Sequence, residues 1–171
     1  IRHVLPTFPF IYILVAWGCS RIKFSRTLLA ASAAWLIGSA ALTYPHYLSY
    51  YNALAGGTER GYLIATDSNY DWGQDFYRLR KFVEDQHIER IAIDYFCGAS
   101  PRYYLGNKYE PWQSAKGPPV GWFAISINAL QGAHAAIGPG FSRKPEDSYE
   151  WLRNKKPVTR AGMSILIYKF E

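Results

Sequence analysis

Two apolar runs without a charged residue constrain what the first quarter of the chain can form. Residues 4–19 read VLPTFPFIYILVAWGC, and residues 27–44 read TLLAASAAWLIGSAALTY. Eighteen helical residues rise about 27 Å, close to the roughly 30 Å hydrocarbon thickness of a bilayer. The first run is shorter, and its helix must extend to Ile1 or to Ile22 if it is to span the bilayer. Small residues in the second run favour close helix packing in lipid. The sequence predicts two transmembrane helices within residues 1–44, with two buried core helices as the alternative.

The loop between the runs predicts the topology. It reads SRIKFSR at residues 20–26 and holds Arg21, Lys23 and Arg26 without an acidic residue. Cytoplasmic loops are enriched in Lys and Arg, so we expect this basic loop in the cytoplasm. The chain after Tyr44 is then expected on the extracytoplasmic side of a bacterial inner membrane.

Residues 45–57 are rich in tyrosine. Tyr44, Tyr47, Tyr50 and Tyr51 recur at the spacing of one helix face. At headgroup level a tyrosine buries its ring and hydrates its hydroxyl. The pattern predicts an aromatic juxtamembrane helix that ends at the glycines 56 and 57. The alternative is that the same tyrosines pack against other protein helices.

The charge distribution excludes one class of partner. Of the 19 Lys and Arg residues, four lie before residue 45 without an acidic residue, and the remaining 127 residues hold 15 basic and 13 acidic side chains. A nucleic-acid-binding surface needs clustered cations on a folded face, so we expect no nucleic-acid partner. Membrane lipid is the expected partner of the basic N-terminal quarter.

From residue 58 the pattern changes to short apolar runs separated by amphipathic stretches. We predict strands at 62–66, 90–96, 122–127 and 163–170, helices at 72–83 and 145–152, a pairing segment at 158–160 and an exposed loop at 106–119. Residues 58–171 are therefore predicted to form a small extracytoplasmic α/β domain with a mixed sheet, and the fold class is membrane α plus α/β.

The densest polar cluster is DSNYDWGQD at residues 67–75. Its carboxylate and amide side chains are Asp67, Asn69, Asp71, Gln74 and Asp75. Alternating oxygens suggest a calcium loop, but Trp72 and Arg78 stand where an EF-hand needs glycine and glutamate. Three interpretations stay open: capping of the following helix by Asp71 and Gln74, an acceptor or sugar site, and a divalent metal site.

Four segments, in this order, resemble a known family: RHVLPTFPF, YPHYLSYYNALAGG, DSNYDWGQD and KPVTRAGMSILIYKF. They resemble the C-terminal region of bacterial membrane glycosyltransferases that are similar to dolichyl-phosphate-mannose-protein mannosyltransferases. The resemblance covers nearly all 171 residues. It implies a multi-span enzyme of the GT-C type that takes a sugar from a polyprenyl-phosphate carrier on the outer membrane face.

The resemblance also implies where the chemistry lies. In these enzymes the catalytic acid is expected in an outer loop near the true N-terminus. The chain opens on Ile1 rather than Met, so we expect a C-terminal fragment without catalytic residues. Arg2 and His3, in the RHxLP motif, are candidates for contacting the lipid phosphate, with interfacial anchoring as the alternative. No cofactor is expected.

Two other classes of function remain possible. One is a membrane-anchored carbohydrate-binding module whose tyrosines and tryptophan at 103, 104, 109 and 112 stack on sugars. The other is a structural cap for the membrane helices. Neither the donor sugar nor the acceptor can be identified from the sequence.

Overall fold

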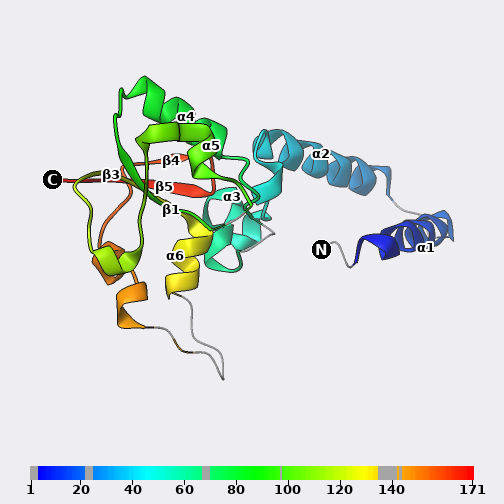
Figure 1. Cartoon of the computed structure of the whole chain (residues 1–171). Coiled ribbons are helices and arrows are strands. Elements are labelled where there is room, and N and C mark those ends of the chain that lie inside the picture. Colours follow the sequence, from blue (N-terminus) through cyan, green and yellow to red (C-terminus); the bar gives the residue numbers. More distant parts are fainter. Residues whose placement is uncertain (1–3, 22–24, 67–69, 97, 135–141, 143) are drawn as a thin grey trace. The chain divides into compact units, whose positions relative to one another are not determined.

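The computed structural model of the chain describes residues 4–21, 25–66, 70–96, 98–134, 142 and 144–171. These residues form two compact units, Ile1–Tyr47 and Leu48–Glu171. The first unit is helical and the second is an α/β domain (Figure 1).

The first unit contains a short turn of 3-10 helix and two α-helices, η1 (Leu5–Thr7), α1 (Phe8–Arg21) and α2 (Arg26–Thr43). Among the described residues, α2 is the one helix long and apolar enough to cross a membrane, with 18 residues. A signal sequence or a buried core helix can have the same length and composition. The predicted pair of spans is therefore corrected to one candidate.

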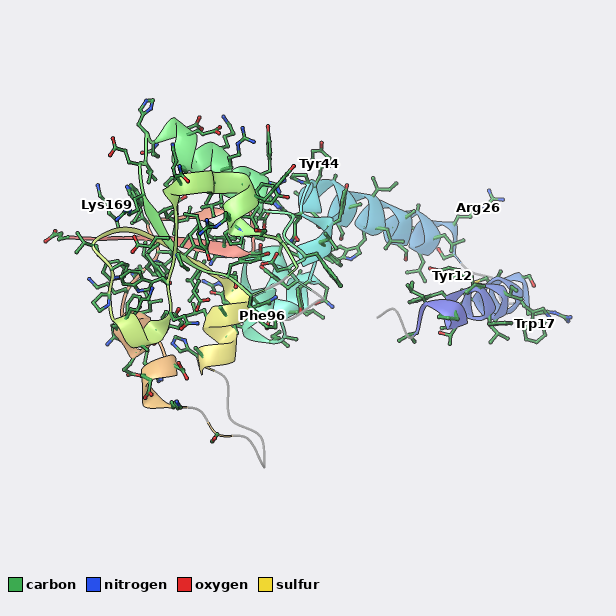
Figure 2. The ribbon with its side chains drawn as sticks, viewed as in Figure 1. Tyr12, Trp17, Arg26, Tyr44, Phe96 and Lys169 are labelled. Carbon is green, nitrogen blue, oxygen red and sulfur yellow. The ribbon has the colours of Figure 1, made fainter. Side chains whose placement is uncertain are left out.

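The first predicted span fails on length. α1 has 14 residues, a rise of about 21 Å. The chain enters it through η1, which contains Pro6, so the first residues of the apolar run do not extend the α-helix. Its side chains are nevertheless exposed all round, and Tyr12 and Trp17 project from the ribbon (Figure 2).

Residues 45–57 do not form the predicted juxtamembrane helix. They contain two separate 3-10 turns, η2 (Tyr47–Ser49) and η3 (Ala53–Ala55). Asn52 interrupts the helical path because its side chain accepts a hydrogen bond from the Ala55 backbone N–H and starts η3 as a new turn. Gly56, with φ of 84°, closes η3 in the left-handed conformation, as expected of a terminating glycine.

A five-stranded mixed sheet forms the centre of the α/β domain (Figure 1). The strands are β1 (Ile91–Asp94), β2 (Tyr109–Pro111), β3 (Gly121–Ser126), β4 (Thr159–Ala161) and β5 (Ile165–Phe170), in the order β2-β1-β3-β5-β4. β1 runs parallel to β2 and β3, whereas β5 is antiparallel to β3 and β4. The predicted α/β class and mixed sheet are confirmed.

Both faces of the sheet are buried, which explains why its strands read as continuous apolar runs. Side chains alternate between two cores: Ile91 and Ile93 pack with helix α4 (Phe76–Asp85) and helix α5 (Pro101–Leu105), while Ala92 faces the other core. That second core contains helix α6 (Ile127–His134) and the turn η9 (Glu150–Leu152). The sheet therefore lies between two helical layers.

Several predicted elements of this domain differ from the structure. The predicted strand at 62–66 is replaced by the 3-10 turn η4 (Gly61–Leu63), which follows the short helix α3 (Gly57–Arg60). The predicted helix at 145–152 is replaced by the 3-10 turns η8 (Pro145–Asp147) and η9. The predicted loop at 106–119 contains η6 (Gly106–Lys108), β2 and η7 (Ser114–Lys116). Short apolar stretches cannot distinguish these elements because tertiary contacts decide between them.

Candidate functional site

Asp75, one of the predicted site residues, links helix α4 to the β4–β5 hairpin through hydrogen bonds. It stands at the N-cap of α4 and is fully buried. Its Oδ2 accepts hydrogen bonds of 2.9 Å from the backbone N–H of Met163 and from the N–H and hydroxyl of Ser164. Its Oδ1 accepts a 2.7 Å hydrogen bond from Arg78. Asp75 is thus a buried structural anion with a complete set of donors.

Asp71 is also fully buried, but it does not cap α4 as the capping interpretation expected. Its Oδ1 accepts hydrogen bonds of 2.8 Å from the Gly73 N–H and from the Tyr95 hydroxyl. This pattern is an Asx turn that also ties the segment to the end of β1. Burial raises the pKa of Asp71, and the two hydrogen bonds counter part of that effect.

The other predicted site residues, Arg2, His3, Asp67 and Asn69, lie outside the described residues. Of the predicted site residues, Asp71 and Asp75 lie within the described ranges, and each has a structural role. Within the described ranges, no group of three or more His, Cys, Asp or Glu residues is placed to hold a metal ion.

A polar pocket of about 440 Å³ lies at the carboxyl ends of β1 and β3. Ligands of open α/β sheets bind at such ends, where neighbouring connections leave in opposite directions. Here the chain passes from β1 to β2 on one side, and β3 lies on the other side of β1. The polar pocket is lined by Asp94, Tyr95, Phe96, Gln113, Ser114, Asn128, Ala129, Gly132, Ala133, Asp147 and Tyr149.

The pocket wall is held in place by a hydrogen-bonded pair. The Tyr149 hydroxyl donates to Oδ2 of Asp94, and the Tyr149 N–H donates to the Ser114 hydroxyl at 2.8 Å. Burial raises the pKa of Asp94, while the hydrogen bond from Tyr149 lowers it by a smaller amount. Burial and the neighbouring Asp94 both raise the pKa of Tyr149, so the phenol stays protonated and donates.

Ser126 positions the opposite wall. It is the last residue of β3, is fully buried, and its hydroxyl accepts hydrogen bonds of 3.1 Å from the N–H groups of Phe96 and Ala129. The second bond caps the first turn of α6, which carries Asn128. Ser126 thereby fixes both the loop after β1 and the start of α6.

A second, apolar pocket of about 410 Å³ adjoins the first. It is lined by Tyr62, Leu63, Ile64, Ala65, Thr66, Phe96, Asn128, Gln131 and Gly132. The two pockets share Phe96, Asn128 and Gly132. The Phe96 ring is 61% exposed and lies beside α6 (Figure 2), so an apolar surface is available on the shared rim.

The aromatic residues that the sequence suggested for sugar stacking divide between the two cores: Tyr104 and Tyr109 pack against the core that contains α4, and Trp112 packs against the other. Tyr104 stacks on Phe76 at 5.2 Å, and the Trp112 indole donates to the Gly117 carbonyl. Tyr103, at 84% exposed, is the most accessible of them.

The sequence did not predict Asp94 and Asn128 as site residues, because each lies in or beside an apolar run. Their position directly at a strand end is the signal that could have identified them.

The polar pocket suits an uncharged polyhydroxylated ligand. Its described lining contains the carboxylates of Asp94 and Asp147 and the amides of Gln113 and Asn128, and no Lys, Arg or His. Carboxylates and amides offer acceptors for hydroxyl groups, and an exposed ring offers a face for C–H groups.

No protein-family model, no curated protein and no solved structure matches this chain.

Proposed function

We propose that this chain supplies the C-terminal region of an integral-membrane glycosyltransferase that transfers a sugar from a polyprenyl-phosphate donor to an acceptor on the outer membrane face. In this proposal α2 spans the membrane and the α/β domain is extracytoplasmic. The catalytic acid comes from residues preceding this chain, and the polar pocket binds the acceptor.

The polar pocket is the observation that carries the proposal. It combines carboxylate and amide side chains with an exposed ring at the carboxyl ends of parallel strands. A few polar groups beside an apolar face are typical of a ligand pocket, and these groups can hydrogen-bond the hydroxyls of a sugar. The domain that holds it follows an apolar helix of 18 residues along the chain. These features agree with the resemblance of the RHVLPTFPF and DSNYDWGQD segments to that enzyme class.

Arg2 and His3 are proposed to contact the lipid phosphate as the sugar departs. An arginine can donate two parallel hydrogen bonds to phosphate, and a histidine can donate one. Such contacts stabilise the negative charge that develops on the leaving group.

The test is transfer by membranes that contain the whole protein carrying these residues. Polyprenyl-phosphate sugars with a radiolabelled sugar are supplied, and label appearing in any non-donor product is measured. We expect transfer in the wild type and a loss of at least tenfold in Phe96→Ala and Asp94→Asn. Tyr77→Ala, at an exposed aromatic of α4 outside the pocket, is the matched control. Transfer that is unaffected by both pocket variants would contradict the proposed role of the pocket.

A carbohydrate-binding module without catalysis is the second candidate, because the same pocket would serve it. The assay separates the two: membranes that bind saccharide but transfer no label with any polyprenyl-phosphate donor would favour the module.

A further inference from the structure

The two pockets of the α/β domain differ in chemistry although they share a wall. The polar pocket holds Asp94 and Asp147, whereas the described lining of the apolar pocket holds no charged residue. Leu63 and Ile64, which line the apolar pocket, are 63% and 67% exposed. Two adjoining sites, one with carboxylates and one whose described lining is uncharged, match a ligand that carries polar groups at one end and is apolar at the other.

We infer that the joined pockets bind one amphiphilic glycoside, with an uncharged or cationic sugar in the polar pocket and its apolar aglycone against Leu63, Ile64 and Phe96. The inference rests on the proposed function only in naming this glycoside the acceptor. Binding itself does not require transfer.

The charge of the polar pocket selects the sugar class. With two carboxylates and no cation among its described lining residues, it repels a carboxylate or phosphate on the ligand. A polyprenyl-phosphate donor is therefore the wrong occupant, although its tail would suit the apolar pocket. Neutral hexoses and amino sugars carry no such penalty, and an ammonium group is attracted.

The shared wall sets how the two parts of the ligand connect. Gly132 lies on α6 and lines both pockets. Apart from its chain neighbours and the backbone of α6 itself, no described heavy atom lies within 4 Å of a Cβ built at Gly132. The side chain of another residue at this position therefore extends into open space beside both pockets, and a large one obstructs the passage between them.

The test measures binding of glucosides to the full chain held in amphipol, because alkyl-glycoside detergents would compete. The probes are methyl and hexyl glucoside, hexyl glucosaminide and hexyl glucuronide. We expect hexyl glucoside to bind at least tenfold tighter than methyl glucoside, because each buried methylene adds affinity. Hexyl glucosaminide should bind at least as tightly as hexyl glucoside, and hexyl glucuronide at least tenfold more weakly.

Four variants locate the site. The exposed double variant Leu63→Ser, Ile64→Ser should abolish the preference for hexyl over methyl glucoside while methyl glucoside still binds. Asp94→Asn should reduce the discrimination against hexyl glucuronide. Gly132→Leu should weaken hexyl glucoside at least tenfold, and Gly132→Ala, which adds only a methyl group, much less.

Tyr77→Ala, at an exposed tyrosine of α4 that lines neither pocket, is the control, and it should bind all probes like the wild type. Equal affinity for methyl and hexyl glucoside, or a hexyl preference that survives in the double serine variant, would overturn the inference. So would lipid burial of a spin label at Ile64→Cys in nanodiscs without glycoside, since that assigns the apolar face to the bilayer. Binding as expected without sugar transfer would instead refute the proposed enzyme and leave this site standing.

Discussion

Removal of the Asp75 carboxylate should loosen the β4–β5 hairpin more than any other single polar change in the domain. Asp75→Ala deletes four hydrogen bonds and leaves the buried N–H and hydroxyl of Ser164 without their acceptor. A buried donor left without an acceptor costs about 1–3 kcal/mol, so the loss of both Ser164 donors should cost about 2–6 kcal/mol in total. Ser164→Ala removes one of the four bonds and should cost about 1–2 kcal/mol. Arg78→Ala, at a side chain that is 36% exposed, should cost under about 1 kcal/mol.

The assay is hydrogen exchange of the β5 amides in the full chain. A loss of 3 kcal/mol in opening free energy accelerates exchange roughly 150-fold, since each 1.36 kcal/mol is a factor of ten. Gly162→Ala gives an independent check, because Gly162 has φ of 59° and a Cβ there would overlap the Asp75 carboxylate. Gly117→Ala is its control: φ is 73°, but nothing in the described chain lies within 4 Å of the new Cβ. Acceleration below tenfold in Asp75→Ala, or equal effects of the two glycine changes, would refute this account.

The remaining predictions concern pH, topology and the lipid phosphate. Burial raises the folded-state pKa of Asp71 and Asp94, so the folded chain holds these two protons more tightly than the unfolded chain. Their contribution to stability is therefore greatest at low pH. It falls as the pH rises from about 4, the unfolded pKa of Asp, through the raised folded-state values. As the pH rises across this range, the melting temperature of the wild type should fall relative to that of the double variant Asp71→Asn, Asp94→Asn. A constant difference between the two melting temperatures would contradict this prediction. With the native cysteines replaced, Ser25→Cys should resist an impermeant thiol reagent in intact cells while Tyr103→Cys reacts, and the reverse pattern would invert the proposed topology. Arg2→Ala should slow transfer by the whole enzyme roughly thirtyfold to a thousandfold, equivalent to about 2–4 kcal/mol, with partial recovery in Arg2→Lys; normal turnover in inserted, folded protein would leave Arg2 as an anchor only.

Three strands of the sheet were predictable from the sequence because burial on both faces makes them continuous apolar runs, although a similar run at 62–66 does not form a strand. The apolar runs at 90–96 and 163–170 contain β1 and β5, and the run at 122–127 overlaps all of β3 except its first residue. β2 was missed because its three residues include Pro111 and lie on the sheet edge, where little apolar pattern is required. The helix expected at 145–152 divides into two turns, since Tyr149 adopts a left-handed φ of 50° between them.

The candidate site was harder to predict than the fold. The DSNYDWGQD cluster drew attention through its density of oxygen atoms, yet Asp71 and Asp75 direct their oxygens to the domain's own backbone. Which carboxylates serve the fold and which face a pocket depends on partners distant in the chain, such as Ser164 for Asp75 and Tyr149 for Asp94. Sequence spacing does not contain that information.

The place of β5 in the sheet sets the order in which this domain can assemble during synthesis. β5 pairs with β3 on one side and β4 on the other, so the last strand along the chain is an interior one. Until residues 165–170 are available, β3 has an open edge of unpaired backbone groups, which is a template for pairing with other chains. Nascent or proteolysed chains that stop before Ile165 should therefore be bound by chaperones or degraded. Loss of β5 should expose more unpaired backbone in this domain than loss of an edge strand such as β2.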